Sequence, residues 1–311
     1  MTATPRLSIG LPVRNGEPFV SQAIEALLGQ SYTDFELIIT DNASTDSTEE
    51  ICRGYARDDE RIRYYRHPAN IGIGPNQNFS VHEARGELFK WASADDLYAR
   101  TLIESCVAAL DEYPDVVLAH SWTAKIDTAG NLIKAFEYAL STATPYAPER
   151  FRSVLFDRGG DDDYGVIRIE VLRRTGLQGS HHHADHTLIA ELGLLGRFYQ
   201  VPDWLYFRRV HPGQNGRTSM RKRCVNLDPR RASRLRHPAV RLYGEYIWRY
   251  VAAIQRAPLS AEDRLKCYRY LMQWFSGRAV GNETAEPDAI DPPPPLSVND
   301  LVARWNTGIV E

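Results

Sequence analysis

The sequence predicts an α/β protein in which a mostly parallel sheet is flanked by helices and is followed by a helical C-terminal region. In the first part of the chain, short apolar runs alternate with segments of helical periodicity. The runs are apolar throughout rather than at every second position, as expected for parallel strands that are buried on both faces. In the last third, apolar residues recur at helical spacing instead.

Composition and charge narrow the class of protein. With 311 residues, of which 43% are hydrophobic, the chain can bury a large core. The formal net charge of −3 gives no overall attraction for nucleic acid, so we expect no nucleic-acid partner. The sequence has no signal-like start and no apolar run of the roughly 20 residues that span a bilayer. We therefore expect a soluble cytoplasmic protein.

The cysteines Cys52, Cys106, Cys224 and Cys267 are far apart in the sequence and form no CxxC pair. This spacing favours neither a zinc ribbon nor a disulfide framework. We expect reduced thiols that pack in the interior.

The first part of the chain reads as repeated strand, turn and helix. The expected strands lie at 7–13, 35–40, 62–66 and 88–92. A helix is expected after Pro18, a second from a capping box formed by Asp46 and Glu49 through Tyr55, and a third at about 79–84. The third helix follows NIGIGPNQN, a loop rich in Gly and Asn. Because ligands of such sheets bind outside the carboxyl ends of the strands, the turns there should line one crevice.

The middle and last parts are less regular. The expected elements are a helix at 101–113, a strand at 116–120, a hairpin at 122–136, a short helix at 168–174, a helix within HHHADHTLIAELGLLG and an extended segment at 198–210. Two amphipathic helices are expected from the stripes Tyr243, Ile247, Tyr250, Val251, Ile254 and Leu265, Tyr268, Met272, Phe275, the second capped by Ser260. We expect these stripes to face the core.

The strand at 88–92 leads directly into Asp95 and Asp96, within the sequence KWASADD. Two carboxylates at a strand end repel each other, and a divalent cation beside a diphosphate would remove that cost. Ligands that are all oxygen favour Mg²⁺ or Mn²⁺ over zinc. The alternative is that the pair only caps the following helix.

Two neighbouring strand ends also carry polar residues. Asp41 ends the second strand, where its carboxylate can accept an N–H from a nucleobase. Asn70, Gly72, Gly74 and Asn76 form a loop whose backbone can approach a ligand closely. These features make a metal and nucleotide site the better interpretation of KWASADD.

At this point a family resemblance becomes visible. The run LSIGLPVRNGEPFVSQAIEALLGQSYTDFELIITDNASTDST, continued by NIGIGPNQNF and GELFKWASADD, resembles the nucleotide-sugar-binding half of family 2 glycosyltransferases, which have the GT-A fold. The resemblance covers about the first 105 residues in order and spacing. It implies an inverting hexosyltransferase that uses a nucleoside-diphosphate sugar and Mn²⁺ or Mg²⁺, with a UDP-sugar favoured and a GDP- or dTDP-sugar as alternatives.

The resemblance also implies roles for individual residues. Pro12, Val13 and Asn15 would flank the nucleoside, Asp41 would contact its base, and Asp95 would hold the metal on the diphosphate. We expect Asn70, Gly72 and Asn76 to contribute to the same donor site.

The sequence departs from the family pattern at one position. The family's DxD signature overlays Ser93, Ala94 and Asp95, so a serine stands where the first acid is expected. Ala94 and Asp96 are still expected at the donor site, with Asp96 either facing the metal or orienting loops and the donor sugar.

The cluster from His181 to His186 allows several interpretations. Its imidazoles and Asp185 could form a zinc site of their own, or a solvated loop. The resemblance favours Asp185 as the general base, because the family places an Asp at the start of a helix after the sheet. Inversion needs a base on the acceptor side, opposite the leaving diphosphate.

His211, in RRVHPGQ, follows the extended segment. It could be a strand-end histidine bonded to backbone, but the resemblance implies that it closes over the diphosphate as a metal ligand. Arg208 and Arg209 could then meet phosphate oxygens.

The domain organisation follows from the resemblance. We expect a GT-A catalytic domain at 1–215, with a nucleotide-sugar-binding half at 1–105 and an acceptor half at 106–215. A helical extension at 216–311 would contain a Pro-rich linker near 286–296.

The predicted function is transfer of a sugar to a saccharide, lipid-linked or small-molecule acceptor in glycan, glycoconjugate or glycosylated metabolite biosynthesis. The basic stretch 217–241 suggests peripheral contact with the inner face of the membrane, and the C-terminal helices suggest homo-oligomer formation. The alternatives are a sugar nucleotidyltransferase, a nucleotide-sugar-binding protein without transferase activity, and a zinc hydrolase.

Overall fold

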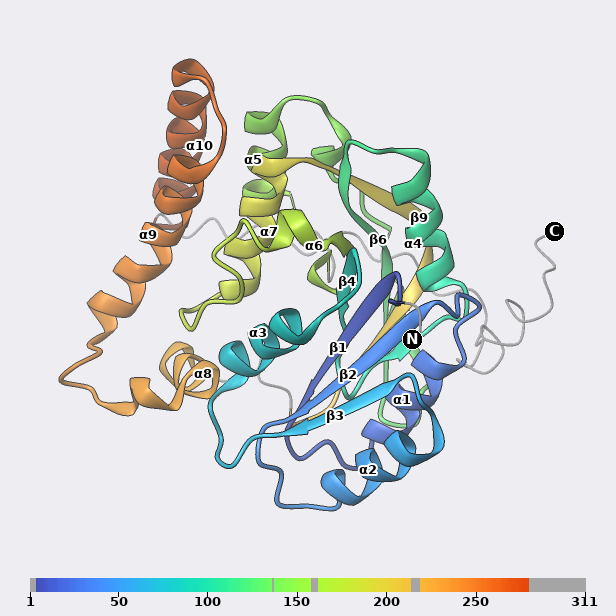
Figure 1. The fold of residues 1–311 in the computed structure, drawn as a ribbon. Coiled ribbons are helices and arrows are strands. Elements are labelled where there is room, and N and C mark those ends of the chain that lie inside the picture. Colours follow the sequence, from blue (N-terminus) through green and yellow to red (C-terminus); the bar gives the residue numbers. More distant parts are fainter. Residues whose placement is uncertain (1–3, 136, 158–161, 214–218, 280–311) are drawn as a thin grey trace.

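The protein is described here from a computed structural model, which covers residues 4–135, 137–157, 162–213 and 219–279 (Figure 1). In these ranges a nine-stranded mixed sheet has the order β3-β2-β1-β4-β8-β6-β9-β5, and β7 pairs with β6 outside this path. The strands are β1 (Leu7–Val13), β2 (Phe35–Asp41), β3 (Ile62–Arg66), β4 (Leu88–Trp91), β5 (Leu97–Tyr98), β6 (Val116–Ile126), β7 (Leu132–Ala135), β8 (Val166–Arg168) and β9 (Arg197–Arg209). The predicted α/β class is confirmed.

The strands β3, β2, β1 and β4 form the parallel half of the sheet. Val13 pairs with Asp41 across β1 and β2, and Gly10 pairs with Trp91 across β1 and β4. The carboxyl ends of these strands therefore lie along one edge, as the alternation of strands and helices predicted.

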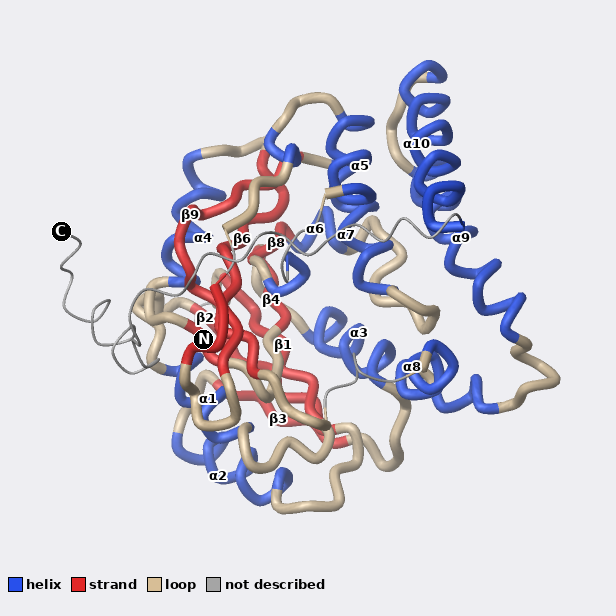
Figure 2. The backbone as a smooth tube through the Cα atoms, turned by 180° about the vertical axis from the view of Figure 1, so that it is seen from behind, coloured by secondary structure: helices blue, strands red, loops and turns tan. Residues whose placement is uncertain are grey.

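Helices cover both faces of the sheet (Figure 2). One apolar cluster contains Leu37 and Ile39, and the intervening Ile38 belongs to a second cluster, because successive side chains of a strand point to opposite faces. The first cluster includes residues of α1 (Val20–Leu28), α2 (Thr48–Asp58) and α4 (Leu102–Glu112). The second includes residues of α3 (Ile73–Glu83), α6 (Ile169–Leu172) and α7 (Ala184–Leu195).

The C-terminal helices add a further layer. A third apolar cluster joins α5 (Ala147–Phe156) and α7 to α9 (Ala239–Arg256) and α10 (Ala261–Ala279), and α8 (Met220–Leu227) lies against α3. None of the helices in the described ranges is long and apolar enough to cross a membrane. All four cysteines are free and buried, as predicted.

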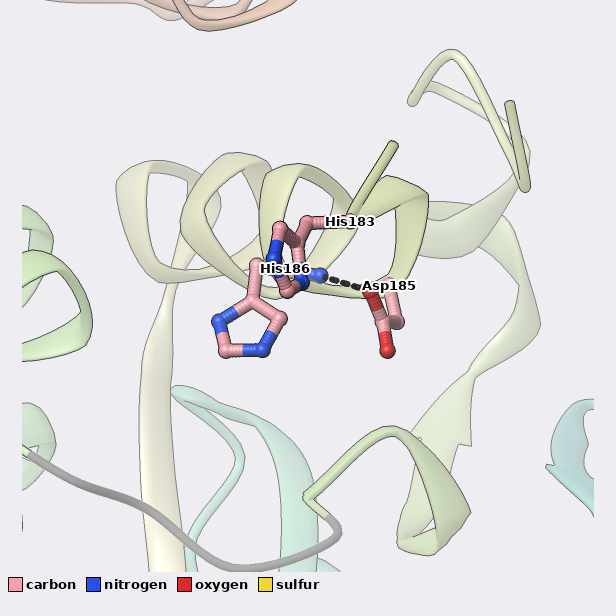
Figure 3. A group of neighbouring side chains, drawn as sticks. All are labelled: His183, Asp185 and His186. Atoms are coloured by element: carbon pink, nitrogen blue, oxygen red, sulfur yellow. Dashed lines mark hydrogen bonds between the residues drawn. The ribbon is translucent and has the colours of Figure 1, made fainter. Parts of the chain in front are cut away.

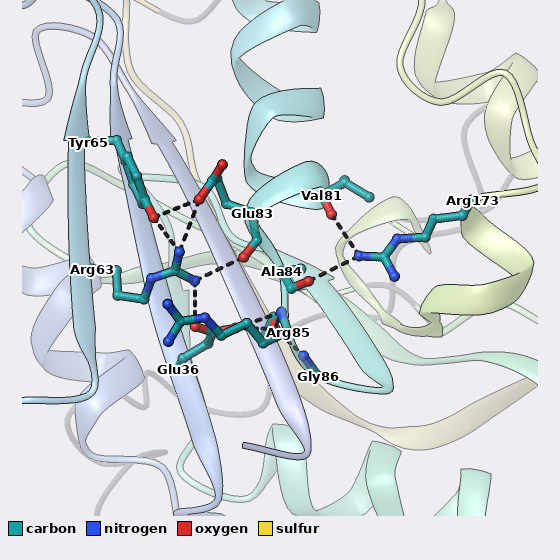
Figure 4. A network of polar contacts seen from close by, with 10 residues as sticks. Glu36, Arg63, Tyr65, Val81, Glu83, Ala84, Arg85, Gly86 and Arg173 are labelled. Carbon is teal, nitrogen blue, oxygen red and sulfur yellow. Dashed lines mark hydrogen bonds and ion pairs between the residues drawn. The ribbon is translucent and has the colours of Figure 1, made fainter. Parts of the chain in front are cut away.

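A network of hydrogen bonds and ion pairs joins the amino ends of the strands to the end of α3 (Figure 4). The Glu36 carboxylate, which is nearly buried, lies 2.8 Å from Arg63 Nη1 and also accepts the Arg85 backbone N–H at 2.8 Å. Arg63 Nη2 in turn lies 3.0 Å from Glu83 Oε2 at the end of α3. Arg173 donates to the Ala84 carbonyl at 3.0 Å. These contacts fix the end of α3 opposite the carboxyl edge of the sheet.

Some strand predictions were incomplete. β5 and β8 were missed, because two- and three-residue segments are too short to show a pattern. The strand expected at 116–120 and the first arm of the expected hairpin form one strand, β6, which pairs with β7 to make the hairpin itself.

Two helix predictions were wrong in detail. α3 begins at Ile73, so Gly74 and Asn76 lie in a helix rather than in the expected loop. Pro75 is compatible with this start because first-turn N–H groups have no intrahelical partner. The expected capping box is absent: α2 begins at Thr48, and the Asp46 carboxylate accepts the Thr48 N–H at 3.1 Å.

Both C-terminal helices exist, and Ser260 caps α10 by accepting the Asp263 N–H at 3.1 Å. The expected inward stripe of α9 is confirmed except at Tyr243, because Tyr250 and Ile254 are buried and Ile247 and Val251 pack against them. The expected stripe of α10 was wrong, because Leu265, Met272 and Phe275 are half or more exposed. The faces that pack inward are carried by Leu242, Tyr246, Tyr250, Ala253, Cys267, Leu271 and Trp274.

Candidate functional site

The turns that follow β1 and β2 are joined by hydrogen bonds at the carboxyl edge of the sheet. The Asn15 N–H donates to Ser44 Oγ at 3.0 Å, and Asn15 Oδ1 accepts the Thr45 N–H at 2.9 Å. Asn15 has φ of 53°, a left-handed conformation that Asn tolerates better than most residues. Half-buried Pro12 and buried Val13 precede this turn. The structure thus brings these three expected donor-site residues next to the turn after β2.

Asp41 is fully buried, and protein groups bind both oxygens of its carboxylate. Oδ1 accepts the Ser44 N–H at 2.8 Å, and Oδ2 accepts the Tyr64 hydroxyl at 2.8 Å. Arg66 Nε lies 3.6 Å from Oδ2. Burial raises the pKa of Tyr64, and the hydrogen bond to Asp41 raises it further. Asp41 therefore shapes the turn after β2 and orients a tyrosine beside it.

Asn42 connects this turn to the loop before α3. Asn42 Nδ2 donates to Asn70 Oδ1 at 2.9 Å and to the Gly72 carbonyl at 3.2 Å, and Asn42 Oδ1 accepts the Ile71 N–H at 2.8 Å. The space where a side chain of residue 72 would lie is occupied by protein and does not face a ligand site. A Cβ there would lie 2.3 Å from the Leu227 carbonyl oxygen, so the missing side chain makes room for the end of α8.

Asn76 is also held by the protein. Its Nδ2 donates to the Thr40 carbonyl at 2.8 Å, its Oδ1 lies 3.0 Å from His67 Nε2, and it is 2% exposed. The structure therefore places Asn76 as a connection between α3 and the end of β2.

Asp95 and His211 meet at the end of β4. Asp95 Oδ2 lies 2.7 Å from His211 Nε2, and the Ser93 hydroxyl donates to Asp95 Oδ1. Both side chains are partly exposed, 31% for Asp95 and 18% for His211. The Phe19 ring packs on the imidazole with 5.2 Å between centroids. The two expected metal ligands, 116 residues apart in the chain, are thus in contact.

Asp96 points to a different part of the structure. It is 4% exposed, its Oδ1 accepts the Arg209 N–H at 2.8 Å, and its Oδ2 accepts the Tyr206 hydroxyl. These bonds continue the antiparallel pairing of β5 with β9, in which Leu97 lies beside Phe207. Asp96 therefore fixes the end of β9, two residues before His211.

Arg209 does not reach toward a phosphate site, contrary to the expectation from the sequence. Its guanidinium group donates to the Asp95 carbonyl at 2.8 Å, to Gln22 Oε1 at 2.8 Å and to the Thr128 carbonyl at 3.0 Å. It also packs over the Phe19 ring at 4.5 Å. The Arg209 side chain is only 1% exposed, so it is an internal support of the loop that carries Asp95.

Asp185 lies in the first turn of α7 and is exposed (Figure 3). Its Oδ1 accepts the His186 N–H at 2.9 Å. Desolvation at this position opposes ionisation of Asp185, but His186 and His183 outweigh it and lower the pKa of the carboxyl. Ligand atoms of His183, Asp185 and His186 lie within 4.8 Å of one another, so this group could hold a metal ion.

His181 belongs to the core rather than to that group. It is 2% exposed, and its Nε2 lies 2.9 Å from the Thr187 hydroxyl. Burial lowers the pKa of His181 to about 3, so its ring is neutral at neutral pH. The ring also packs against Tyr246 of α9 with 6.1 Å between centroids.

The sequence model described as Glycosyl transferase family 2 matches residues 8–165, which is just over half of the 311 residues. The chain belongs to glycosyltransferase family 2. The match covers the parallel half of the sheet, the Asp95 loop and β6.

Curated relatives are similar over the same region. An uncharacterized glycosyltransferase of Rickettsia typhi is 35% identical over 111 residues, which are 36% of this chain and 34% of that protein. An uncharacterized glycosyltransferase of Methanocaldococcus jannaschii is 31% identical over 135 residues, which are 43% of this chain and 47% of that protein. The matched part spans between a third and a half of the length of these relatives.

Solved glycosyltransferase structures share the fold over most of the chain. TarS 1–349 of S. aureus, in complex with UDP-GlcNAc, has a TM-score of 0.55 at 15% identity and covers 90% of this chain and 93% of TarS 1–349. The mannosyltransferase PcManGT of Pyrobaculum calidifontis, in complex with GDP-Man and Mn²⁺, has a TM-score of 0.51 at 17% identity and covers 91% of this chain and 89% of its own. At this identity the likeness shows the GT-A fold alone.

One polar pair of this family 2 glycosyltransferase was missed from the sequence. His120 Nδ1 lies 3.0 Å from Asp162 Oδ1, which also accepts the Tyr138 hydroxyl at 3.2 Å, and both side chains are buried. Burial raises the pKa of Asp162, but His120 and Tyr138 outweigh it, and His186 contributes to the net lowering. The isolated His120 within the apolar run at 116–120 was the sequence feature that could have pointed to this pair.

Lys90, inside KWASADD, was also missed. It is fully buried, donates to the Tyr164 carbonyl and lies 5.3 Å from the centre of the Tyr98 ring. Burial lowers the pKa of Lys90 to about 8. The turn at 162–164 contacts β4, β6 and α7, so it connects the strand before Asp95 with the helix whose first turn carries Asp185.

Proposed function

We propose that this family 2 glycosyltransferase transfers a sugar with inversion from a nucleoside-diphosphate sugar to a hydroxyl acceptor, and that transfer requires a divalent metal. The observation that carries the proposal is the 2.7 Å contact of Asp95 Oδ2 with His211 Nε2 at the carboxyl end of β4. A partly exposed carboxylate and imidazole at this edge are suited to a cation on the donor diphosphate.

The donor atoms fit Mn²⁺ better than Mg²⁺. Mg²⁺ is held by oxygen ligands in near-ideal octahedral geometry, whereas His211 offers a nitrogen. Two protein ligands leave positions for diphosphate oxygens and water. The bound metal would neutralise the leaving diphosphate. The presence of Mn²⁺ in the PcManGT structure supports this choice.

We assign the base role to Asp185. The bond from the anomeric carbon to the diphosphate oxygen breaks as the bond to the acceptor oxygen forms on the opposite face, and the acceptor proton passes to the Asp185 carboxylate. Because its pKa is lowered, Asp185 is ionised at neutral pH and can accept the acceptor's hydrogen bond. The proton transfers late, since a carboxylate is too weak to ionise a hydroxyl beforehand.

The donor's nucleoside would lie against the joined turns after β1 and β2. Pro12, Val13 and Asn15 would flank it, and Asp41 would act on its base by positioning Tyr64, whose hydroxyl the buried Asp41 carboxylate accepts. Asn70, Gly72 and Asn76 would support the outer wall, Ala94 would line the diphosphate, and Asp96 would position His211 rather than touch the metal. A UDP-sugar is favoured, with GDP- and dTDP-sugars as alternatives, and TarS and PcManGT were solved with UDP-GlcNAc and GDP-Man.

The rest of the chain would serve the acceptor. We retain a catalytic domain at 1–215 with halves at 1–105 and 106–215, and an extension at 216–311. Residues 216–218 and 280–311, with the Pro-rich linker near 286–296, lie outside the described residues. The acceptor would be a saccharide, a lipid-linked sugar or a small molecule, in a cytoplasmic reaction of glycan, glycoconjugate or metabolite biosynthesis.

A paired experiment tests the assignment. UDP-, GDP- and dTDP-sugars are titrated with Mn²⁺ into the wild type, Asp95→Ala and Asp185→Asn, and transfer is measured with a panel of hydroxyl acceptors. Asp95→Ala should lose metal-dependent donor binding. Asp185→Asn should retain donor binding and lose transfer by roughly 10²- to 10⁴-fold.

The outcomes separate the alternatives. Unchanged metal-dependent donor affinity in Asp95→Ala would overturn the metal site. Donor binding without transfer or donor hydrolysis under any metal would indicate a binding protein, and synthesis of the nucleotide sugar from a sugar phosphate and a nucleoside triphosphate would indicate a nucleotidyltransferase.

A further inference from the structure

The outer side of α9 is apolar, although its inner side already packs in the core. Leu242 and Tyr246 are buried in the cluster shared with α5, α7 and α10. On the opposite side, Val240 is 78% exposed and Trp248 58%. These two residues are eight positions, about two helical turns, apart and so lie on the same side of α9. The outer apolar face is therefore a feature of α9 that the packing of the described residues does not explain.

The segment that leads into α9 extends away from the sheet. In both views the connection from α8 to α9 reaches outward from the body of the molecule (Figures 1 and 2). Leu235 in this connection is 95% exposed, between the exposed residues Arg234 and Arg236. In the part of the chain that the structure describes, no carboxylate pairs with either guanidinium group. We call residues 229–248 the basic arm.

The basic arm carries a net positive charge after its internal ion pairs are counted. It contains five arginines and one acid, Glu245. Glu245 pairs with Arg231 and Arg241 (3.0 Å), and Asp228 just before the arm pairs with Arg230 at 2.9 Å. The arginines at the tip thus remain available to an anionic partner. Arg217 and Thr218 of the originally predicted basic stretch lie outside the described residues.

We propose that the basic arm docks on the surface of an anionic lipid bilayer. Leu235, Val240 and Trp248 enter the interface, and the tip arginines bind lipid phosphates. The surface of an anionic bilayer has a layer of charged headgroups above the boundary of the apolar acyl chains. The arginines would contact the headgroups, and the tryptophan and aliphatic side chains would reach the acyl-chain boundary. This contact is peripheral.

Other occupants fit the basic arm less well. A nucleic acid would use the arginines but leave the aliphatic side chains exposed to water. A second copy of this chain in a symmetric dimer would bring the same positive patch against itself. An anionic bilayer satisfies both the charge and the apolar face. Docking does not depend on the proposed transfer reaction, because vesicle binding needs neither donor nor acceptor.

The test is co-sedimentation of the full chain with vesicles of phosphatidylcholine alone or mixed with phosphatidylglycerol. The wild type should bind the mixed vesicles, and binding should weaken with added salt. Because each arginine near an anionic surface contributes about 1 kcal/mol, Arg234→Glu/Arg236→Glu should reduce partitioning roughly 30-fold or more. Leu235→Ser should reduce it without changing the charge. These side chains are exposed, so the fold should persist, as circular dichroism can check.

The matched control is Arg57→Glu/Arg174→Glu, which changes the same charge at exposed sites on α2 and after α6. It should leave vesicle binding within about twofold of the wild type. Equal loss of binding in this control would overturn the proposal, as would equal binding to neutral vesicles or no binding at all. Binding of heparin or nucleic acid in place of vesicles, or a dimer in solution that is lost with Trp248→Ser, would assign the basic arm to another partner.

Discussion

Asp96 and Arg209 are joined by a hydrogen bond from the Arg209 N–H to Asp96 Oδ1 at 2.8 Å, across 113 residues of sequence. The bond aligns the end of β9 with the loop after β4, which places His211 against Asp95. Two adjacent acids therefore have different roles: one holds the strand that delivers His211, and the other contacts His211 itself.

The division between the two acids predicts different effects of their removal. Asp96→Ala removes the carboxylate that accepts from the buried Arg209 N–H and from the Tyr206 hydroxyl, and the loss of a buried hydrogen-bond partner costs about 1–3 kcal/mol for each donor. We expect the free energy of unfolding to fall by roughly 2–6 kcal/mol and Mn²⁺ binding to weaken. Asp95→Ala should change stability by less than about 1 kcal/mol while losing Mn²⁺. Urea unfolding and Mn²⁺ titration measure both, and equal stability of the two variants would contradict this.

Gly72 is expected to stabilise the fold, independently of any role in donor binding. Gly72→Ala places a Cβ 2.3 Å from the Leu227 carbonyl oxygen at φ of 97°, so something must shift. We expect a loss of about 1–3 kcal/mol in unfolding free energy without any ligand. The control is Gly54→Ala in α2, where a Cβ meets nothing within 4 Å. It should gain up to about 1 kcal/mol. A Gly72→Ala protein as stable as the wild type would show that this packing is not required.

His181 predicts part of the acid sensitivity. Its pKa falls from 6.5 to about 3 on folding because the ring is buried. Between those pH values only the unfolded chain binds this proton, so stability falls as pH falls. From about pH 7.5 to about pH 5 the loss should be about 2 kcal/mol. His181→Gln retains a polar partner for Thr187 but cannot bind the proton. Between the same two pH values, the unfolding free energy of His181→Gln, measured in urea, should therefore fall by about 2 kcal/mol less than that of the wild type. An equal fall in the two proteins would argue against burial of His181 as the cause.

Zinc should inhibit transfer by binding at the proposed base. His183, Asp185 and His186 offer two imidazoles and a carboxylate, a ligand set typical of Zn²⁺. Added Zn²⁺ should therefore compete with the acceptor in the Mn²⁺-loaded enzyme, and Co²⁺ should give a ligand-field absorption band without any substrate. His183→Ala should weaken Co²⁺ binding roughly tenfold or more. The exposed His82→Ala is the control, and equal Co²⁺ binding by both variants would exclude this site.

Sequence patterns predicted the parts of the fold that depend on local periodicity. The four parallel strands were found because strands that are buried on both faces appear as continuous apolar runs. The C-terminal helices were found because their apolar residues recur at helical spacing. β5 and β8 were missed because their residues become strands only by pairing with distant partners, such as Tyr98 with Tyr206. The inward face of α10 was misjudged because this helix carries apolar residues on both sides: Met272 and Phe275 are exposed, whereas Leu271 and Trp274 are buried.

By itself, the sequence determined the α/β class, the family and the identity of Asp95 and His211 as a candidate metal pair. The resemblance and the residue types were enough for that. Only the tertiary structure decided that Asp96 turns to β9, that Arg209 supports the Asp95 loop and that Gly72 makes room for α8. Those roles depend on contacts between residues that are far apart in the sequence, and local sequence patterns do not indicate which distant residues come into contact.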